Sequence, residues 1–159
     1  MKIQSVIANN HRKAFEVRAG SRPFQFPYAK STPRPTIADP VADVFVDKEL
    51  GREALSYALK SGRTGVIHVD QILEYNQDPS YLRNILLYNL TIEAKKRVAK
   101  SGLAKREIIR RLDTSAAQLY RLLDQTNYRK SIDQMLRLLQ VLDCEIDFVV
   151  KQRSTRKAA

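Results

Sequence analysis

Residues 103–124, LAKREIIRRLDTSAAQLYRLLD, hold two short stretches of helical apolar spacing on either side of a turn. The apolar positions of the first stretch are Leu103, Ile108 and Leu112. We expect a helix over 103–111 that ends at Asp113. Ser115 and Gln118 then fit a capping box, in which the Ser115 hydroxyl accepts from a backbone N–H and the Gln118 side chain reaches back. A further helix is therefore predicted to begin at Ser115.

The second of these helices has one apolar face and one open face. Its apolar residues, Leu119, Leu122 and Leu123, share a side that we expect to pack on the preceding helix. The residues left toward solvent or a ligand are Ala116, Ala117, Gln118 and Arg121. Two short helices joined by a turn of about three residues, the second presenting its N-terminal face, form the geometry that enters a DNA major groove.

Helical spacing also flanks this pair. Asp78 and Pro79 form a helix-start signal for a helix over 78–100, because Asp caps free N–H groups and Pro suits the first turn. After a loop that contains Tyr128, residues 132–142 repeat apolar positions behind a cap at Ser131. We expect residues 145–151 to form a strand with an open edge.

These residues resemble the helix-turn-helix core of the lambda repressor-like (Xre-type) family. The similarity extends to residues 131–148, which resemble that family's next helix and short terminal strand, and it covers about 60 of the 159 residues. The resemblance implies a bundle of four or five helices that reads bases with the start of its third helix. It also implies sequence-specific binding of double-stranded DNA, with phosphate contacts around the reading helix.

Carried over by position, the resemblance implies a set of DNA-binding residues. Lys105 would contact phosphate or a neighbouring base, and Ser115 caps the reading helix. Ala116, Ala117 and Gln118 would face base edges, and Arg121 would lie along the DNA backbone. The loop residues that would contact the DNA backbone are Asn127, Tyr128, Arg129 and Lys130.

The chain departs from the family pattern at several positions. Asp113 stands where the family usually has Gly in a left-handed turn, a conformation that Asp tolerates better than most residues. Ile109 replaces a small residue, which would change the angle between the two helices. Ala116 and Ala117 offer methyl groups that suit a thymine methyl but give no hydrogen-bonded readout. Sequence discrimination would thus depend on Gln118, Arg121 and Asn127.

Each assignment has a plainer alternative. Gln118 would serve only its capping box, and Arg121 would pair with Asp124 on its own helix. A further alternative is that the basic bundle binds a protein instead of DNA. Charge argues against it: residues 1–92 carry 12 Lys and Arg against 9 Asp and Glu, whereas residues 93–159 carry 16 against 8. The net charge of +11 favours a polyanionic partner, and the C-terminal half carries most of it.

Other classes of protein find no support in the sequence. No apolar run nears the ~20 residues that span a bilayer, and the first residues lack a secretory signal, so we expect a cytoplasmic protein without a membrane partner. The single cysteine, Cys144, excludes an internal disulfide, and His11 and His68 have no ligand spacing. Without a phosphate loop or nucleophile motif, we expect no cofactor, no metal and no enzymatic activity.

The N-terminal part has short elements and no recognisable chemistry. We expect a hairpin over 3–8 and 12–18, an edge strand over 24–28 and a loop over 31–40. A strand over 41–47, a helix over 50–60 and a strand over 65–69 follow. The predicted fold class is α+β, in which a small N-terminal α+β domain is joined by a long helix to a C-terminal all-α helix-turn-helix bundle. The expected domains are 1–77 and 78–151, with a basic tail over 152–159.

Two functions remain open on this sequence. The first is an autonomous transcriptional regulator, a repressor that binds an inverted repeat as a homodimer. The second is an antitoxin-like protein whose N-terminal domain binds a toxin partner while its C-terminal domain represses its own operon. No feature of the residues separates them.

Overall fold

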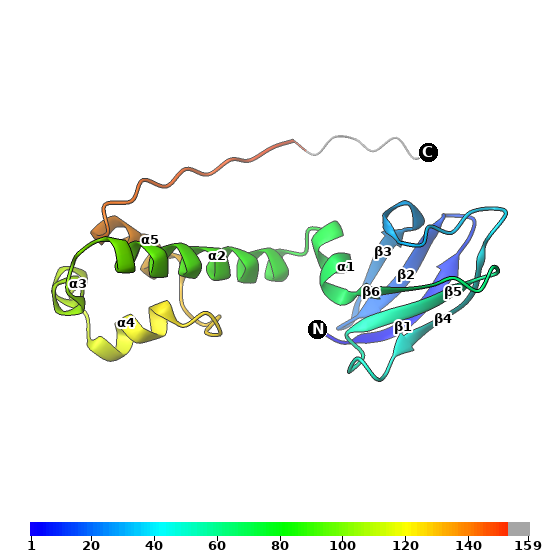
Figure 1. Cartoon of the computed structure of the whole chain (residues 1–159), viewed down its shortest axis with the longest axis horizontal. Helices are drawn as coiled ribbons and strands as arrows, with labels where there is room; N and C mark the ends of the chain where they lie inside the picture. Colours follow the sequence, from blue (N-terminus) through cyan, green and yellow to red (C-terminus); the bar gives the residue numbers. More distant parts are fainter. Residues whose placement is uncertain (153–159) are drawn as a thin grey trace. The chain divides into compact units, whose positions relative to one another are not determined.

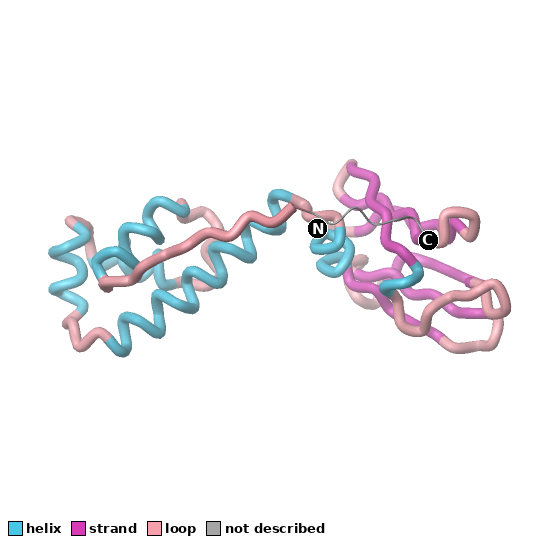
Figure 2. Tube along the Cα trace, turned by 90° about the horizontal axis from the view of Figure 1, so that it is seen from above, coloured by secondary structure: helices cyan, strands magenta, loops and turns pink. Residues whose placement is uncertain are grey.

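The computed structural model describes residues 1–152, and the predicted basic tail lies outside them except for Gln152. The chain divides into two compact units, Met1–Arg83 and Asn84–Ala159. Figure 1 labels the elements, and Figure 2 colours helices, strands and loops differently.

The first unit holds two three-stranded antiparallel sheets. One consists of β1 (Ile3–Asn9), β2 (Ala14–Ala19) and β3 (Arg22–Pro27), in that order. The other consists of β4 (Val41–Asp47), β5 (Ala54–Leu59) and β6 (Thr64–His68). A 3-10 turn, η1 (Tyr28–Lys30), follows β3, and helix α1 (Val69–Tyr75) follows β6. The predicted hairpin is confirmed, and β3, which carries Pro23 and Pro27, lies at a sheet edge as expected.

The two sheets repeat one pattern. In each, the first strand has seven residues, the middle strand six, and the pairing shifts register near the start of the first strand. The shift falls between Ile3 and Ser5 in β1 and between Val41 and Asp43 in β4. β1 and β4 also lie next to each other. The first unit therefore consists of two similar three-stranded meanders.

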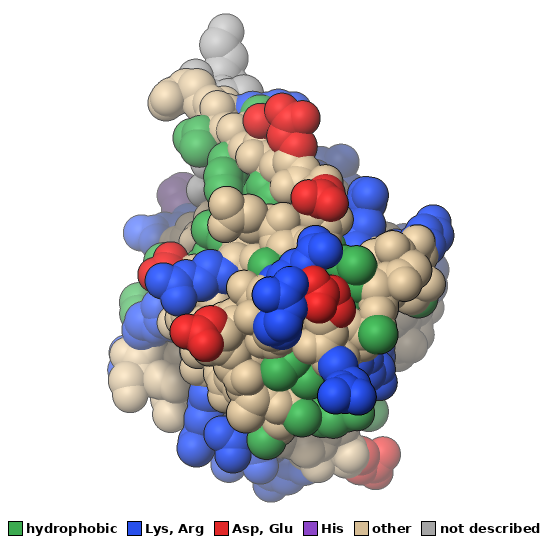
Figure 3. All heavy atoms as spheres, turned by 90° about the vertical axis from the view of Figure 1, so that its left-hand side faces the viewer, with side chains coloured by type: hydrophobic (Ala, Val, Ile, Leu, Met, Phe, Trp, Pro, Cys, Tyr) green, Lys and Arg blue, Asp and Glu red, His purple; other side chains and the backbone are tan. Residues whose placement is uncertain are grey.

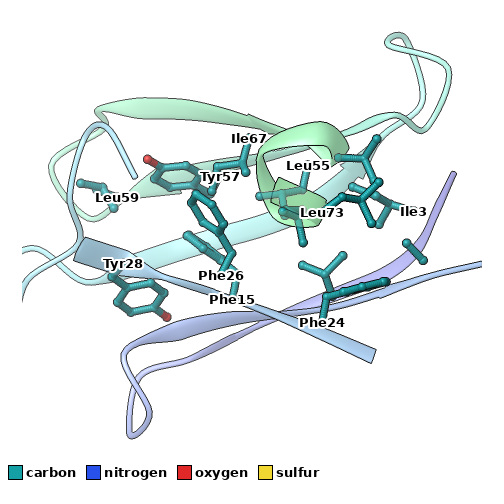
Figure 4. Close-up of a cluster of buried hydrophobic side chains, with 14 residues drawn as sticks. Ile3, Phe15, Phe24, Phe26, Tyr28, Leu55, Tyr57, Leu59, Ile67 and Leu73 are labelled. Atoms are coloured by element: carbon teal, nitrogen blue, oxygen red, sulfur yellow. The ribbon is translucent and has the colours of Figure 1, made fainter. Parts of the chain in front are cut away.

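Aromatic and aliphatic side chains from both meanders and from α1 form the core of this unit (Figure 4). The Phe15 ring lies 4.8 Å from the Tyr28 ring and 4.9 Å from the Tyr57 ring, centroid to centroid. Such tilted and edge-on pairs add stability beyond that of the buried area. Gly65 on β6 lies opposite Tyr57, and a Cβ at Gly65 would collide with the Tyr57 ring.

The second unit contains most of α2 (Pro79–Lys100), then α3 (Lys105–Leu112), α4 (Ala116–Leu123) and α5 (Ile132–Val141). Asp78 starts α2 as predicted, because its Oδ1 accepts from Tyr81 N at 3.0 Å. Ser131 Oγ accepts from Gln134 N while Gln134 Oε1 accepts from Ser131 N, so a complete capping box begins α5. The buried residues of this unit's core are Leu87, Ala94, Ile108, Leu119, Leu122, Met135, Leu138, Leu139 and Leu142.

The predicted fold class was wrong. The chain is not a small N-terminal α+β domain followed by an all-α bundle. Residues 1–152 form an α+β fold with two three-stranded antiparallel sheets and five helices. The first unit includes α1 and the start of α2, and the boundary between the units falls within α2, so helices and sheets do not separate into successive domains.

The helix predicted over 50–60 is the central strand β5. Leu55 and Leu59 have helical spacing, but Leu55, Tyr57 and Leu59 also alternate, and all three are buried in the core. Because β4 and β6 pair with both edges of β5, the sheet satisfies its backbone and overrides the local helical preference. Helix α1, which was not predicted, occupies 69–75, and the expected strand over 145–151 does not form. Within the described part of the chain, no helix has both the length and the apolar character needed to cross a bilayer.

Candidate nucleic-acid interface

Helices α3 and α4 are joined by a tight turn of three residues, 113–115. Asp113 ends α3 in the left-handed conformation, with φ 51°, as predicted from the sequence. Ser115 begins α4, and its Oγ accepts from Gln118 N at 3.2 Å. The Gln118 side chain does not return a bond to the Ser115 backbone, so only half of the predicted capping box forms. The Gln118 amide is thus not used by the cap.

One face of α4 is exposed. Leu119 and Leu122 are buried against the core, whereas Ala116, Ala117 and Arg121 face solvent, as predicted. Gln118 is half-buried at the margin of this face. Tyr120, which was not among the predicted residues, lies on the same face with 57% of its surface exposed. Its position four residues after Ala116 is the signal in the sequence that could have identified it.

Lys105 and Tyr120 bring the start of α3 beside the exposed face of α4. The Lys105 ammonium lies 5.0 Å from the centroid of the Tyr120 ring, within the range of a cation–π contact. An ammonium held over an exposed phenol stays available to a phosphate. Lys105 therefore extends the candidate interface from α4 onto α3.

A surface hollow of about 600 Å³ lies beside α4. Five of the predicted DNA-binding residues line it together, namely Gln118, Arg121, Asn127, Arg129 and Lys130. Asp124, Thr126 and Gln134 complete the lining. The other predicted residues, Lys105, Ser115, Ala116, Ala117 and Tyr128, lie outside this hollow. The structure thus brings Gln118 and Arg121 of α4 together with Asn127, Arg129 and Lys130 of the loop that follows this helix.

The side-chain amide of Asn127 forms hydrogen bonds within its own loop. Its Nδ2 donates to the Arg121 carbonyl at 3.2 Å, and its Oδ1 accepts from Arg129 N at 3.1 Å. Both ends of the amide are therefore engaged, and Asn127 positions the loop instead of offering a free amide. Asp124 is likewise engaged: its Oδ1 accepts from Thr126 N and Oγ1 at 2.9 and 2.8 Å, and these bonds lower the pKa of Asp124. No ion pair joins Arg121 to Asp124 within residues 1–152.

Lys130 is buried, with 4% of its surface exposed. Its Nζ donates to the carbonyl oxygens of Leu122 and Asp124, at 2.8 and 2.6 Å. These carbonyls lie at the C-terminal end of α4, where helix carbonyls lack intrahelical partners. Burial lowers the pKa of Lys130, and the neighbouring Asp124 charge opposes that shift. Lys130 is therefore placed to stabilise the end of α4, whereas the adjacent Arg129 is exposed.

Glu107 holds two arginines on α3. Its carboxylate accepts from Arg110 Nη2 at 2.6 Å and from Arg111 Nε at 2.9 Å. These bonds lower the pKa of Glu107 to about 2, so the carboxylate is charged at neutral pH. Two of the basic side chains on α3 are thereby partly neutralised. Sequence reasoning counted them only as part of the net charge.

Lys and Arg side chains are spread over the face shown in Figure 3, with carboxylates and hydrophobic side chains among them. The exposed cations of α3, α4 and the loop after α4 are Lys105, Arg106, Arg110, Arg111, Arg121 and Arg129. Comparison of the chain with protein-family models, with curated proteins and with solved structures found no match.

Proposed function

We propose that this protein is a sequence-specific, double-stranded DNA-binding transcriptional regulator, a repressor whose reading helix is α4. The observation that carries the proposal is the open face of α4 after a three-residue turn, in which Ala116, Ala117 and Arg121 are exposed and Gln118 lies at the margin. A helix presented in this way fits a major groove. The resemblance to the lambda repressor-like family supports the same reading.

Charge around α4 supports the proposal. Lys105 lies beside Tyr120 at one side of the face, and Arg121 and Arg129 line the hollow at the other. Cations on both sides of a reading helix suit the two phosphate strands that border a groove. With about six such contacts, log K should fall against log salt with a slope of roughly −5.

The test is duplex binding by the full chain. Genomic fragments selected by the purified protein supply a cognate site, and a shuffled duplex serves as random DNA. The double variant Arg121→Ala/Arg129→Ala should lose at least about tenfold in affinity. The variant Lys2→Ala/Lys48→Ala removes the same charge from the first unit and should lose much less. Failure to bind any duplex at 50 mM salt would refute the proposal.

A protein partner on the first unit is a second candidate, in the manner of an antitoxin. Phe45 on β4 and Val66 on β6 are 51% and 54% exposed, and both flank Ser56 of β5 in register. This apolar row on the outer side of a sheet favours a contact with another protein. Co-purification with the product of an adjacent gene, abolished by Phe45→Ser/Val66→Ser but not by Arg121→Ala/Arg129→Ala, would support this candidate.

A further inference from the structure

A second hollow lies in the first unit, between the β1–β2 turn, Tyr28 and the segment 34–40. Its volume is about 690 Å³, within the range of ligand pockets for small molecules. Its apolar wall is formed by Pro35, Ile37, Ala38 and Pro40. Ile37 is 93% exposed, so a large apolar side chain stands in solvent at this site. A ligand with an apolar body would cover it.

The segment that forms the wall is held at both ends. Near its start, the Tyr57 hydroxyl donates to the Pro33 carbonyl at 2.7 Å. Near its end, Arg63 Nη2 lies 2.7 Å from Asp39 Oδ2, and Ser61 N donates to Asp39 Oδ1 at 2.7 Å. The bonds from Arg63 and Ser61 lower the pKa of Asp39, and Asp39 is not among the residues that line the hollow. The wall is therefore preformed, which reduces the entropic cost of binding.

The polar groups of the hollow favour an anion. Lys13 and Arg34 contribute two cations, and no Asp or Glu is among the described residues that line it. The buried Tyr28 hydroxyl donates to Asn10 Oδ1 at 3.0 Å, which orients the carboxamide and leaves Asn10 Nδ2 as a donor. Tyr28 N also donates to the Lys13 carbonyl at 2.9 Å, which joins the two sides of the hollow.

We propose that this hollow binds a small organic anion, an acid with an aromatic or aliphatic body. The acid group would lie between Lys13 and Arg34 with Asn10 as a further donor, and the body would pack on Pro35 and Ile37. This proposal is independent of DNA binding, because it concerns residues of the first unit only.

The test is calorimetric titration of the full chain with three acids, 2-naphthoate, indole-3-acetate and decanoate. Each is compared with its neutral alcohol. At least one acid should bind with a Kd below 1 mM, and about tenfold tighter than its alcohol. Lys13→Gln/Arg34→Gln should weaken the acid roughly tenfold and leave the alcohol unchanged. Ala38→Trp, which fills the hollow, should weaken both.

The control is Lys2→Gln/Lys48→Gln, which removes two cations from the same unit outside the hollow. It should leave the affinity for the acid unchanged, and circular dichroism should show that every variant is folded. The proposal would be overturned if none of the three acids binds, if acid and alcohol bind equally, or if the control weakens the acid as much as the variant in the hollow does.

Discussion

The Lys130 ammonium donates to the main-chain carbonyl of Asp124 at 2.6 Å, six residues back along the chain. This bond and its partner to the Leu122 carbonyl join the loop after α4 to the last turn of that helix. The basic pair Arg129 and Lys130 therefore divides into an exposed cation and a buried structural cation. Only the exposed one is available to a phosphate.

We expect Lys130→Met to destabilise the protein. Met replaces the stem but not the ammonium, so the carbonyls of Leu122 and Asp124 lose a charged donor, at a cost of about 1–3 kcal/mol. Urea denaturation followed by circular dichroism measures the loss, with Arg129→Met as the matched control. If the two variants unfold at the same urea concentration, Lys130 has no structural role.

Glu107→Gln should strengthen binding to random duplex DNA. The substitution removes the carboxylate that holds Arg110 and Arg111, so both cations gain freedom to contact phosphates and the salt slope should steepen by roughly one to two. Glu93→Gln is the control, because it changes the net charge by the same amount. Glu93 pairs with Lys96 and Arg97 on α2, outside α3. Equal effects of the two variants would assign the gain to net charge alone.

Protonation of the Asp78 carboxylate in acid should lower the stability of the first unit. Its side chain is 1% exposed and lies 2.6 Å from Arg22 Nη1. Burial raises the pKa of Asp78, but bonds from Tyr81 N and Arg22 outweigh it and leave the pKa below the ordinary 3.8. The folded-state pKa is thus lower than the unfolded one, so this stabilisation is complete above the unfolded value and is lost as the pH falls through the folded value.

Asp78→Asn tests this pH dependence. Asn keeps a capping oxygen for Tyr81 N but loses the charge that pairs with Arg22. Its thermal midpoint should lie below that of the wild type at pH 7, and the gap should narrow as the pH falls below the ordinary 3.8 and close once Asp78 is protonated in the folded state. A gap of constant size from pH 7 to pH 2.5 would show that the charge does not contribute.

Local signals predicted the elements whose cause is local. Asp78 and Pro79 begin α2, Ser131 caps α5 and Asp113 adopts the left-handed turn, and each of these depends on neighbours within about four residues. The exposed face of α4 followed from apolar spacing in the same way.

Non-local contacts decided what sequence reasoning missed. β5 is a strand because β4 and β6 pair with both its edges, and Gly65 leaves room for Tyr57 on the next strand. The burial of Lys130 depends on carbonyls six and eight residues away in a turn that the sequence does not specify. The similarity between the two three-stranded meanders likewise depends on strand pairing, because the residues of one meander differ from those of the other.

We expect a dimer that uses residues 145–152. These residues make no strand within the described chain, and Phe148, Val149 and Val150 are 63%, 77% and 95% exposed. An apolar extended segment with unpaired backbone suits pairing with the same segment of a second copy. Val149→Pro removes an N–H and should give a monomer at tens of micromolar by sedimentation velocity, with an unchanged circular dichroism spectrum. A monomeric wild type, with and without DNA, would contradict this.

Substitutions at Gln118 and Arg129 should separate base reading from phosphate contact at the edge of α4. The Gln118 amide is free of the cap and lines the hollow beside Arg121, where it can meet an adenine edge through two hydrogen bonds. Gln118→Ala should therefore cost about 1–3 kcal/mol on the cognate site and much less on random DNA.

Arg129 should behave in the opposite way. Its exposed guanidinium follows α4 in a loop held by Asn127, where it offers charge but little base geometry. Arg129→Ala should weaken cognate and random duplexes alike and reduce the salt slope by roughly one. Fluorescence anisotropy on both duplexes at several salt concentrations measures the two effects. If Arg129→Ala changes sequence preference while Gln118→Ala weakens both duplexes equally, the reading face is not the N-terminal part of α4.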